Sequence, residues 1–193
     1  MKIPQPFFLQ DNVVDIARQL LGKYVFTQIA GQIAGGIITE TEAYQGVTDR
    51  ACHAFGGRRT ARNQMMYAQG GVIYVYLCYG LHHLLNFVTN QKDIPEAVLI
   101  RGIKPTHGME TILQRTGKSA ITPDVTNGPG KVSKALGITT LLNGTSLDSD
   151  LIWAEDRGVY IPPNYIMQTP RIGVEYAGAD AKLPYRFVLN GSL

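Results

Sequence analysis

Cysteine is almost absent from this sequence, which contains only Cys52 and Cys78 among its 193 residues. Two cysteines without a C-x-x-C spacing do not form a metal site by themselves, and we expect two reduced thiols rather than a disulfide. Cys52 directly precedes His53, but neighbouring side chains of an extended chain point in opposite directions, so a catalytic Cys–His pair is disfavoured. No other motif calls for a metal ion or an organic cofactor, and we expect neither.

Long hydrophobic runs are also missing. Residues 1–9 contain only a short apolar run, which Asp11 soon interrupts, and they carry no cleavage-site pattern. No segment approaches the roughly 20 apolar residues that a membrane span needs. We therefore expect a soluble, cytoplasmic protein that has no membrane partner.

Charge of one sign is only slightly in excess, since the formal net charge is +3 and charged residues make up 17% of the chain. This balance is compatible with a polyanionic partner but does not require one. Apolar residues make up 45% of the chain, which is enough for a hydrophobic core. The length predicts one domain, spanning residues 1–193. The 21 glycines and 10 prolines predict many turns between short elements.

Hydrophobic periodicity predicts an α+β fold with a mainly antiparallel sheet. An amphipathic helix is predicted for residues 11–21, with Asp11 or Asn12 as its N-cap and Gly22 at its end. Residues 45–57 and 117–130 are predicted loops. The predicted strands are residues 24–29, 33–42, 72–78, 84–89, 97–103, 171–176 and 186–189, and the further predicted helices are residues 60–68, 108–115 and 131–136.

The strand that leads to Tyr44 carries the most informative side chains. Because side chains alternate across a strand, Glu40, Glu42 and Tyr44 share one face with Ile38. A carboxylate beside an aromatic ring suits a pocket that stacks a flat ligand and activates a water molecule. Taken alone, however, the segment is equally compatible with a solvent-facing edge strand.

An ordered set of motifs along the chain adds to this pattern. The set consists of Thr-Glu-Ala-Tyr at 41–44, His53, Gly-Gly-Arg-Arg-Thr-Ala-Arg-Asn at 56–63, Tyr-Val-Tyr at 74–76, Tyr-Gly at 79–80, Asn86, Arg101, Asn-Gly-Pro-Gly-Lys at 127–131, Arg-Ile-Gly-Val at 171–174 and Pro-Tyr-Arg-Phe at 184–187. Each motif is weak by itself. In this order, and over nearly the whole chain, the set resembles the alkyladenine (3-methyladenine) DNA glycosylase family.

The resemblance implies a monofunctional DNA glycosylase. Such an enzyme flips alkylated or deaminated purines out of duplex DNA and hydrolyses the N-glycosidic bond, which initiates base excision repair. The resemblance also implies that the α+β sheet is curved and that a protruding β-hairpin enters the DNA minor groove. The expected partner is double-stranded DNA that contains damaged purines, and the expected state is a monomer. A bacterial protein of this kind would be associated with the nucleoid.

Glu42 is the residue that we expect to activate water. As a general base it would deprotonate a water molecule that attacks the sugar C1′, and its charge would favour the developing oxocarbenium ion. The family's catalytic glutamate falls on Glu42, whereas Glu40 is the rival, which we interpret as structural or secondary. No lysine lies beside this cluster in the sequence, which favours water over an amine nucleophile.

The resemblance also implies roles for the remaining site residues. Tyr44, His53 and Tyr76 would bind the flipped base, since every base offers a face for stacking. Without the resemblance, Tyr74 and Tyr76 would be interpreted as half-buried strand aromatics, since the chain has ten tyrosines, and His53 as a structural hydrogen-bonding residue. Asn86 would exclude guanine by a clash with its exocyclic amino group, although asparagine often only bonds to backbone.

Tyr79, directly before Gly80, is the expected intercalating wedge at a hairpin tip. Whether His82 and His83, which follow this tip, contribute to the groove is left open by the sequence. Each basic side chain taken separately would be expected on a solvated surface. The candidates for binding DNA phosphates are Arg58, Arg59, Arg62, Arg101, Lys131 and Lys134. The resemblance places Arg101 beside the flipped nucleotide, and a helix that starts at Gly-Pro-Gly-Lys at 128–131 would present free backbone amides to a phosphate.

Two other functions compete with this hypothesis. A nucleoside N-glycosidase could use Glu40 and Glu42 as an acid–base pair, but carboxylates two apart on a strand do not flank a bond from opposite sides. A non-enzymatic module could bind damaged DNA through Tyr79 and the arginines. Glu42 disfavours this alternative, because an unpaired carboxylate weakens binding to a polyanion unless it performs chemistry.

Overall fold

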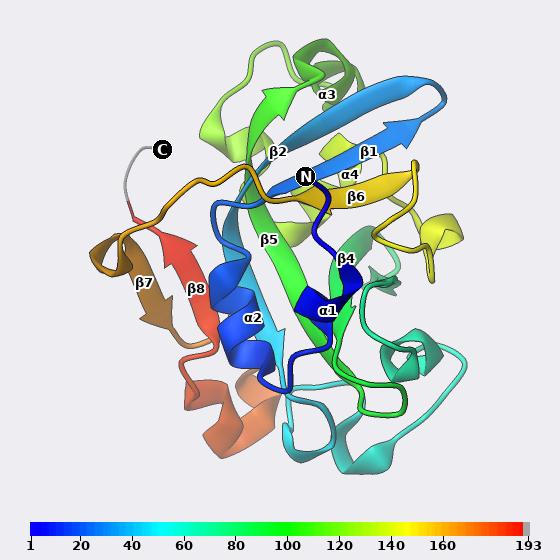
Figure 1. Cartoon of the computed structure of the whole chain (residues 1–193), viewed down its shortest axis with the longest axis vertical. Coiled ribbons are helices and arrows are strands. Elements are labelled where there is room, and N and C mark those ends of the chain that lie inside the picture. The colour runs from blue at the N-terminus through cyan, green and yellow to red at the C-terminus, as the bar shows by residue number, and fades with distance from the viewer. Residues whose placement is uncertain (191–193) are drawn as a thin grey trace.

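An antiparallel sheet of eight strands organises the computed structural model of the chain (Figure 1). Residues 1–190 are described, so the last three residues of the predicted domain lie outside the described part. Six strands follow the order β3-β4-β5-β2-β1-β6, while β8 pairs with β2, and β7 pairs with β8. The strands are β1 (Tyr24–Ile29), β2 (Gln32–Tyr44), β3 (Ile73–Cys78), β4 (His82–Thr89), β5 (Glu96–His107), β6 (Ile152–Glu155), β7 (Ile166–Thr169) and β8 (Arg186–Leu189).

Within residues 1–190, four α-helices accompany the sheet, and they confirm the predicted α+β class with its curved, mainly antiparallel sheet. They are α1 (Gln5–Phe8), α2 (Val13–Gln19), α3 (Met109–Thr116) and α4 (Pro129–Leu136). Of the two predicted N-caps of α2, Asn12 performs the role, since its side chain accepts hydrogen bonds from Val14 N and Asp15 N. Across residues 1–190, no helix combines the length and apolarity of a membrane span.

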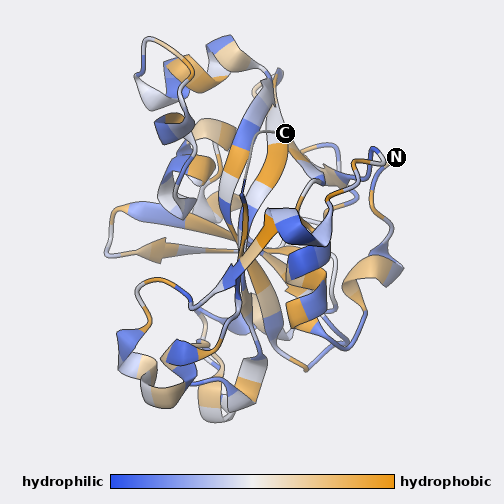
Figure 2. Ribbon diagram, turned by 90° about the vertical axis from the view of Figure 1, so that its left-hand side faces the viewer, coloured by the Kyte–Doolittle hydropathy of each residue, from blue (hydrophilic) through white to orange (hydrophobic). Residues whose placement is uncertain are grey.

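The two faces of the sheet have different environments. One face carries the main hydrophobic core, which includes Leu85, Phe87 and Ile100 and packs against α2 and α4. The Thr41 hydroxyl donates a hydrogen bond of 2.8 Å to Ala17 O and so ties β2 to α2 on this face. Figure 2 shows hydrophobic residues concentrated along the central strands. The opposite face carries polar and aromatic side chains together with a second, smaller hydrophobic cluster, which includes Met66, Tyr74 and Val88.

The register of the strands aligns several of these side chains in one row. Tyr74 on β3 lies opposite Asn86 on β4, Asn86 lies opposite Leu99 on β5, and Leu99 lies opposite Glu42 on β2. Residues that lie directly opposite each other in an antiparallel sheet project from the same face. The fold thus brings onto one surface residues that lie 32 to 57 positions from Glu42 in the sequence.

A β-bulge interrupts the pairing of β2 with β5 beside Glu42. Glu40 lies opposite Gly102 and Thr41 lies opposite Ile100, so Arg101 is the extra residue on β5. Bulges of this kind redirect a side chain and frequently occur next to active sites. Gly102 fits here because a Cβ atom at this position would lie 3.0 Å from Thr39 Oγ1 and 3.1 Å from Glu40 Cβ.

Two predicted elements are wrong. Residues 60–68 form turns and a short 3₁₀-helix (Gln64–Tyr67) instead of an α-helix. The Asn63 side chain accepts a hydrogen bond of 2.7 Å from Thr60 N, and such local bonds compete with helical ones. Residues 171–176 are not a strand, because Gly173 adopts a φ of 74° and a 3₁₀-helix begins at Glu175. Strands β6 and β7 were not predicted, since four residues are too few to establish alternation.

Candidate active site

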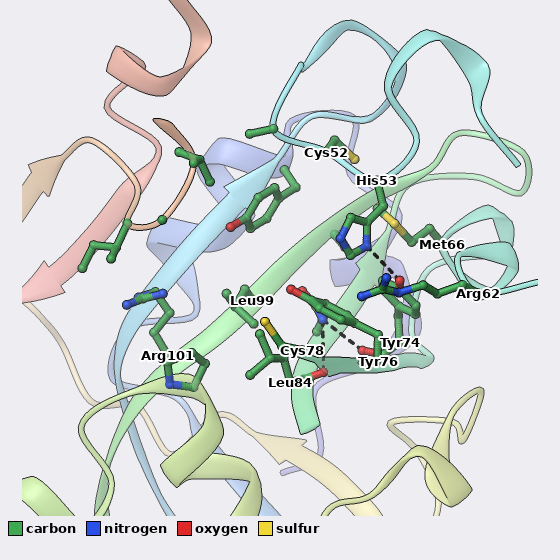
Figure 3. A pocket seen from close by; sticks show the side chains of 18 of the residues that line it. Cys52, His53, Arg62, Met66, Tyr74, Tyr76, Cys78, Leu84, Leu99 and Arg101 are labelled. Carbon is green, nitrogen blue, oxygen red and sulfur yellow. Dashed lines mark hydrogen bonds between the residues drawn. The ribbon is translucent and has the colours of Figure 1, made fainter. Parts of the chain in front are cut away.

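A cavity of about 430 Å³ opens on the face of the sheet opposite the main hydrophobic core (Figure 3). Its volume lies within the usual range for small-ligand pockets and is sufficient for a purine base. Strands β2 to β5 form its floor, and irregular segments around His53 and Ile172 form its walls. The predicted site residues that line it are Tyr44, His53, Arg62, Tyr76, Tyr79, Asn86 and Arg101.

Glu42 lies directly behind this lining and is 0% exposed. Its carboxylate accepts hydrogen bonds from Tyr44 Oη at 2.9 Å and from the backbone N–H of Ile172 at 2.8 Å. The Arg101 guanidinium lies 3.4 Å from Oε1. Burial raises the pKa of Glu42 above its usual value, although Arg101, Ile172 and Tyr44 each act to lower it. A carboxylate of this kind ionises less readily than an exposed one and is the more basic for it.

Glu40 has a different environment from Glu42. Its Oε1 accepts hydrogen bonds from Arg101 Nε and Arg186 Nε, both at 2.7 Å. It borders a separate depression near Lys104 and Val188, and it is absent from the lining of the aromatic cavity. Two guanidinium groups therefore balance its charge, which supports its interpretation as a structural carboxylate.

Arg101 is buried between the two glutamates, with 9% of its surface exposed. The bulge in β5 directs the Arg101 guanidinium toward Glu40 and Glu42. Arg101 also borders the cavity (Figure 3). Its place at the edge of the cavity is compatible with the contact beside the flipped nucleotide that the resemblance implies. Because the ion pairs balance its charge, the geometry favours a role in orienting the carboxylates.

The aromatic wall of the cavity is built from His53, Tyr74 and Tyr76. The ring of His53 lies 4.6 Å from that of Tyr76 in an edge-on arrangement, and Tyr74 stacks on Tyr76 at 5.3 Å. His53 Nδ1 and Tyr74 Oη are 2.9 Å apart and share a hydrogen bond (Figure 3). Burial, together with Arg62 and Arg58, lowers the pKa of His53 to about 4, so its ring is neutral at pH 7.

Tyr74 and Asn63 are supporting residues whose roles the sequence did not reveal. Tyr74 was expected to be an ordinary strand aromatic, yet it lines the cavity and holds the His53 ring. Asn63 Nδ2 donates hydrogen bonds to His53 O at 2.9 Å and to Arg58 O at 2.8 Å. The signal for Asn63 was its place at the end of the basic run, although only the folded loop shows its partners.

Asn86 lies on the cavity floor and is 4% exposed. Its Nδ2 donates hydrogen bonds to Tyr74 O at 3.1 Å and to Leu84 O at 3.3 Å. The backbone bonding that we considered as an alternative is therefore present. These bonds fix the orientation of the amide, and they leave its oxygen as the group that can face a ligand.

Tyr79 occupies the tip of the hairpin that β3 and β4 form, and it is 89% exposed. Tyr79 and Gly80 have φ angles of 51° and 70°, and Leu81 N donates a hydrogen bond of 3.0 Å to Cys78 O. Cys78 pairs with His82, so three residues connect the strands, and the positive φ of Tyr79 is a conformation that asparagine and glycine adopt more readily than tyrosine. A tyrosine there is strained, and strained positions cluster at functional sites.

The expected phosphate ligands are distributed over several places. Arg58 and Arg62 line a crevice that adjoins the cavity at His53. Arg59 forms an ion pair with Asp93 at 2.8 Å, and Lys131 forms one with Asp124. Apart from Arg62 and Arg101, these cations do not line the aromatic cavity.

The N-terminus of α4 lies close to the cavity, since Pro129 is one of the lining residues. Its N-cap, Gly128, has no side chain to bond to the free amides of the first turn. Helix N-termini with free amides favour anions. Helix α4 begins at Pro129, two residues before the predicted start at Lys131. The free backbone amides that we predicted at the start of this helix are present.

The two cysteines do not form a disulfide with each other. Cys52 and Cys78 are free, and burial raises the pKa of Cys52 to about 12. Within residues 1–190, His, Cys, Asp and Glu side chains do not gather in groups of three or more that could hold a metal ion.

Comparisons with known proteins show which proteins are similar to this chain over nearly its whole length. The sequence model of the methylpurine-DNA glycosylase family matches residues 7–193. A protein of Chlamydia felis is 46% identical over 189 residues, which cover 97% of this chain and 96% of that protein. A protein of Bdellovibrio bacteriovorus is 42% identical over 196 residues, which cover 100% of this chain and 97% of that protein. A protein of Bacillus cytotoxicus is 39% identical over 200 residues, which cover 100% of this chain and 98% of that protein. All three carry the name "Putative 3-methyladenine DNA glycosylase".

Proposed function

Because the chain belongs to the methylpurine-DNA glycosylase family, we propose that it excises damaged purines from duplex DNA with a water molecule that Glu42 activates. Membership makes the chain a DNA glycosylase, a hydrolase of N-glycosyl bonds that acts on DNA in DNA repair. The proposed substrates are alkylated or deaminated purines, such as 3-methyladenine, 7-methylguanine, hypoxanthine and ethenoadenine. The observation that carries the proposal is the burial of Glu42 directly behind an aromatic cavity.

Base flipping is the first proposed step, since the sugar C1′ is inaccessible within the stacked duplex. The flipped purine would lie between the aromatic side chains that line the cavity, chiefly Tyr44, His53 and Tyr76. Stacking contributes about 1–3 kcal/mol per base, which offsets much of the cost of unstacking. Because His53 is neutral at pH 7, it would not repel a purine that alkylation has made cationic.

Hydrolysis is the second proposed step. A water molecule between the sugar and Glu42 would lose a proton to the carboxylate as its oxygen attacks C1′, and the purine would leave with the electrons of the C1′–N bond. The ionised carboxylate would also stabilise positive charge on the sugar. Tyr44 Oη, Ile172 N–H and Arg101 hold the carboxylate in one orientation, which supports such precise placement.

Contacts outside the cavity would hold the distorted DNA. Tyr79 would fill the space that the flipped nucleotide leaves, because minor-groove proteins commonly insert such a wedge. Arg58 and Arg62 beside the cavity, together with the free amides at the start of α4 and Lys131, would contact phosphates. These contacts would favour double-stranded DNA over a free nucleoside as the substrate, with one protein molecule per lesion.

The two competing functions receive less support from the geometry. Glu40 and Glu42 lie on the same face and contact the same Arg101, so they do not flank a bond as paired glycosidase carboxylates do. A module that only binds DNA would gain nothing from a buried carboxylate behind its base pocket.

Release of base from a duplex that contains one hypoxanthine or one 3-methyladenine tests the proposal. We expect free base and an abasic strand, and no strand cleavage, because a water nucleophile leaves no covalent intermediate. The same duplex with an undamaged adenine is the control. Turnover of free nucleosides but not of the duplex would favour a nucleosidase, and retention of the duplex without turnover would favour a binding module; either result would contradict the proposal.

A further inference from the structure

One wall of the cavity is irregular and contacts the proposed general base through its backbone. Ile172, Gly173 and Val174 line the cavity, and none of them belongs to a helix or strand. The N–H of Ile172 donates its hydrogen bond to Glu42 Oε1. No strand ladder holds this wall in place, so other contacts must fix the distance between Ile172 and Glu42.

Arg171 supplies these contacts. Its side chain is 0% exposed, which is rare for arginine unless it is paired. Nη1 donates to the Asp49 carboxylate and to Ala43 O at 2.9 Å, while Nη2 donates to Asp49 Oδ1 at 2.8 Å and to Asp180 O at 3.3 Å. The guanidinium also lies 4.9 Å from the centre of the Tyr44 ring. Arg171 therefore supports two of the groups that bond to Glu42, the Ile172 N–H and the Tyr44 hydroxyl.

Asp49 connects the pair to the wall that carries His53. Its carboxylate, 3% exposed as a residue, also accepts hydrogen bonds from Gln45 N at 3.0 Å and Ala51 N at 2.9 Å. One buried ion pair thus joins the end of β2, the loop that leads to His53 and the segment that carries Ile172. A bidentate arginine–carboxylate pair is geometrically specific, which suits a positioning role.

We propose that the Asp49–Arg171 pair is a positioning device for Glu42, which holds the Ile172 N–H and the Tyr44 ring against the carboxylate. The inference rests on the proposed function, in which Glu42 is the general base. Neither Asp49 nor Arg171 contacts the substrate in this account. Both act on the reaction only through the orientation and protonation of Glu42.

The consequence is a specific dependence on pH. A hydrogen bond to the ionised form of a carboxylate favours ionisation, so a loosened Ile172 raises the pKa of Glu42 further. The other charged or titratable groups that face Glu42 are Arg101 from β5, Glu40 and Tyr44 from β2, and Arg171 itself. All of these groups remain in an Asp49→Asn variant, so a change in its pH profile reports on the device.

Single-turnover base release across pH tests the inference in Asp49→Asn and Arg171→Lys. Each variant loosens a different half of the pair, so if one of them fails to fold, the other carries the same test. We expect an acidic limb displaced upward by about one pH unit, hence about a tenfold lower rate on that limb. The difference in rate should shrink at higher pH, where Glu42 is ionised in the wild-type protein and in both variants. Binding of lesion duplex should be nearly unchanged. Asp156→Asn, which breaks the remote Lys23–Asp156 pair at 2.6 Å, is the matched control and should keep the wild-type profile.

Two outcomes would overturn the positioning role: a deficit of equal size at every pH, or a wild-type profile in both variants. Glu42→Gln is measured in parallel to separate this inference from the proposed function. If Glu42→Gln still releases base, the proposed function itself is wrong. If Glu42→Gln is inactive while Asp49→Asn and Arg171→Lys behave like the wild type, only the positioning role is wrong.

Discussion

Glu42 is subject to opposing influences at the scale of a single residue. Burial favours its protonated form, while a guanidinium, a backbone N–H and a phenol favour the carboxylate. A residue whose pKa is raised is protonated below that pKa and ionised above it. Since the proposed mechanism needs the ionised form, base release should increase as the pH rises through the raised pKa of Glu42.

Tyr44→Phe separates the two contributions of Tyr44. The variant keeps the ring that lines the cavity but loses the hydroxyl that donates to Glu42 at 2.9 Å. That hydrogen bond lowers the pKa of Glu42, so its loss should move the acidic limb of the single-turnover rate to higher pH, by about half a unit to one unit. Lesion binding should change little. An unmoved acidic limb would show that the Tyr44 hydroxyl does not tune the general base.

Asn86→Ala tests selectivity against guanine. The amide of Asn86 is fixed on the cavity floor by two backbone carbonyls, which gives it the rigidity that a steric filter needs. The ratio of guanine release to hypoxanthine release should rise by about tenfold, since removing one unfavourable contact is typically equivalent to 1–3 kcal/mol. An unchanged ratio, or an equal loss of both activities, would make Asn86 a structural residue.

Sequence patterns predicted the residues of the cavity better than their partners. Alternation along β2 correctly placed Glu42 and Tyr44 on one face, because a period of two is a local property of a strand. The Tyr44–Glu42 hydrogen bond, the Tyr74–His53 bond and the burial of Arg101 depend on the register of distant segments. No local pattern contains that information, so the burial of Arg101 between two glutamates was not predicted.

At the scale of elements, short or irregular segments control the site more than the long strands do. The bulge in β5 directs Arg101 toward the glutamates, and the irregular segment after Pro170 presents a backbone donor to one of them. Neither could be predicted, because both depend on long-range pairing. The long strands and α2 were predicted well, since their periodicity and caps are encoded locally.

The hairpin of β3 and β4 provides a prediction at this scale. Tyr79→Asn should relieve backbone strain at the position whose φ is 51° and raise the melting temperature by about 2–4 °C, while it weakens binding to lesion duplex. Base release from a single strand, where little stacking must be replaced, should be much less affected. Tyr160→Ala is the control, since Tyr160 is 78% exposed and lies beside α2, away from the cavity. Equal losses on duplex and single strand would remove the wedge role.

At the scale of the whole molecule, the net charge of +3 is too small to make the protein a general polyanion binder. Affinity for DNA must instead come from a few cations placed around the cavity. Several candidates already have acidic partners, such as Arg59 with Asp93 and Lys131 with Asp124. Within residues 1–190, Arg58 has no ion pair, and it lies on the crevice beside His53.

The salt dependence of DNA binding distinguishes these cations. The logarithm of the binding constant should fall linearly with the logarithm of salt concentration, and Arg58→Ala should reduce that slope by about one. Arg59→Ala should reduce it less, because Asp93 already balances its charge. A slope near zero for the wild-type protein would contradict phosphate contacts altogether. Equal reductions of the slope in Arg58→Ala and Arg59→Ala would show that the ion pair with Asp93 does not weaken the contact of Arg59 with DNA.

The central claim is that Glu42, and not Glu40, is the general base. It is tested most directly by single-turnover base release and lesion-duplex binding, measured side by side for Glu42→Gln and Glu40→Gln. Glu42→Gln keeps the shape of the side chain but removes the base, so base release should fall by about 10²–10⁴-fold while binding is retained. Glu40→Gln should keep substantial activity, because Glu40 bonds to Arg101 and Arg186 and borders a separate depression near Lys104 and Val188. An active Glu42→Gln, or the loss of activity in Glu40→Gln alone, would contradict the account.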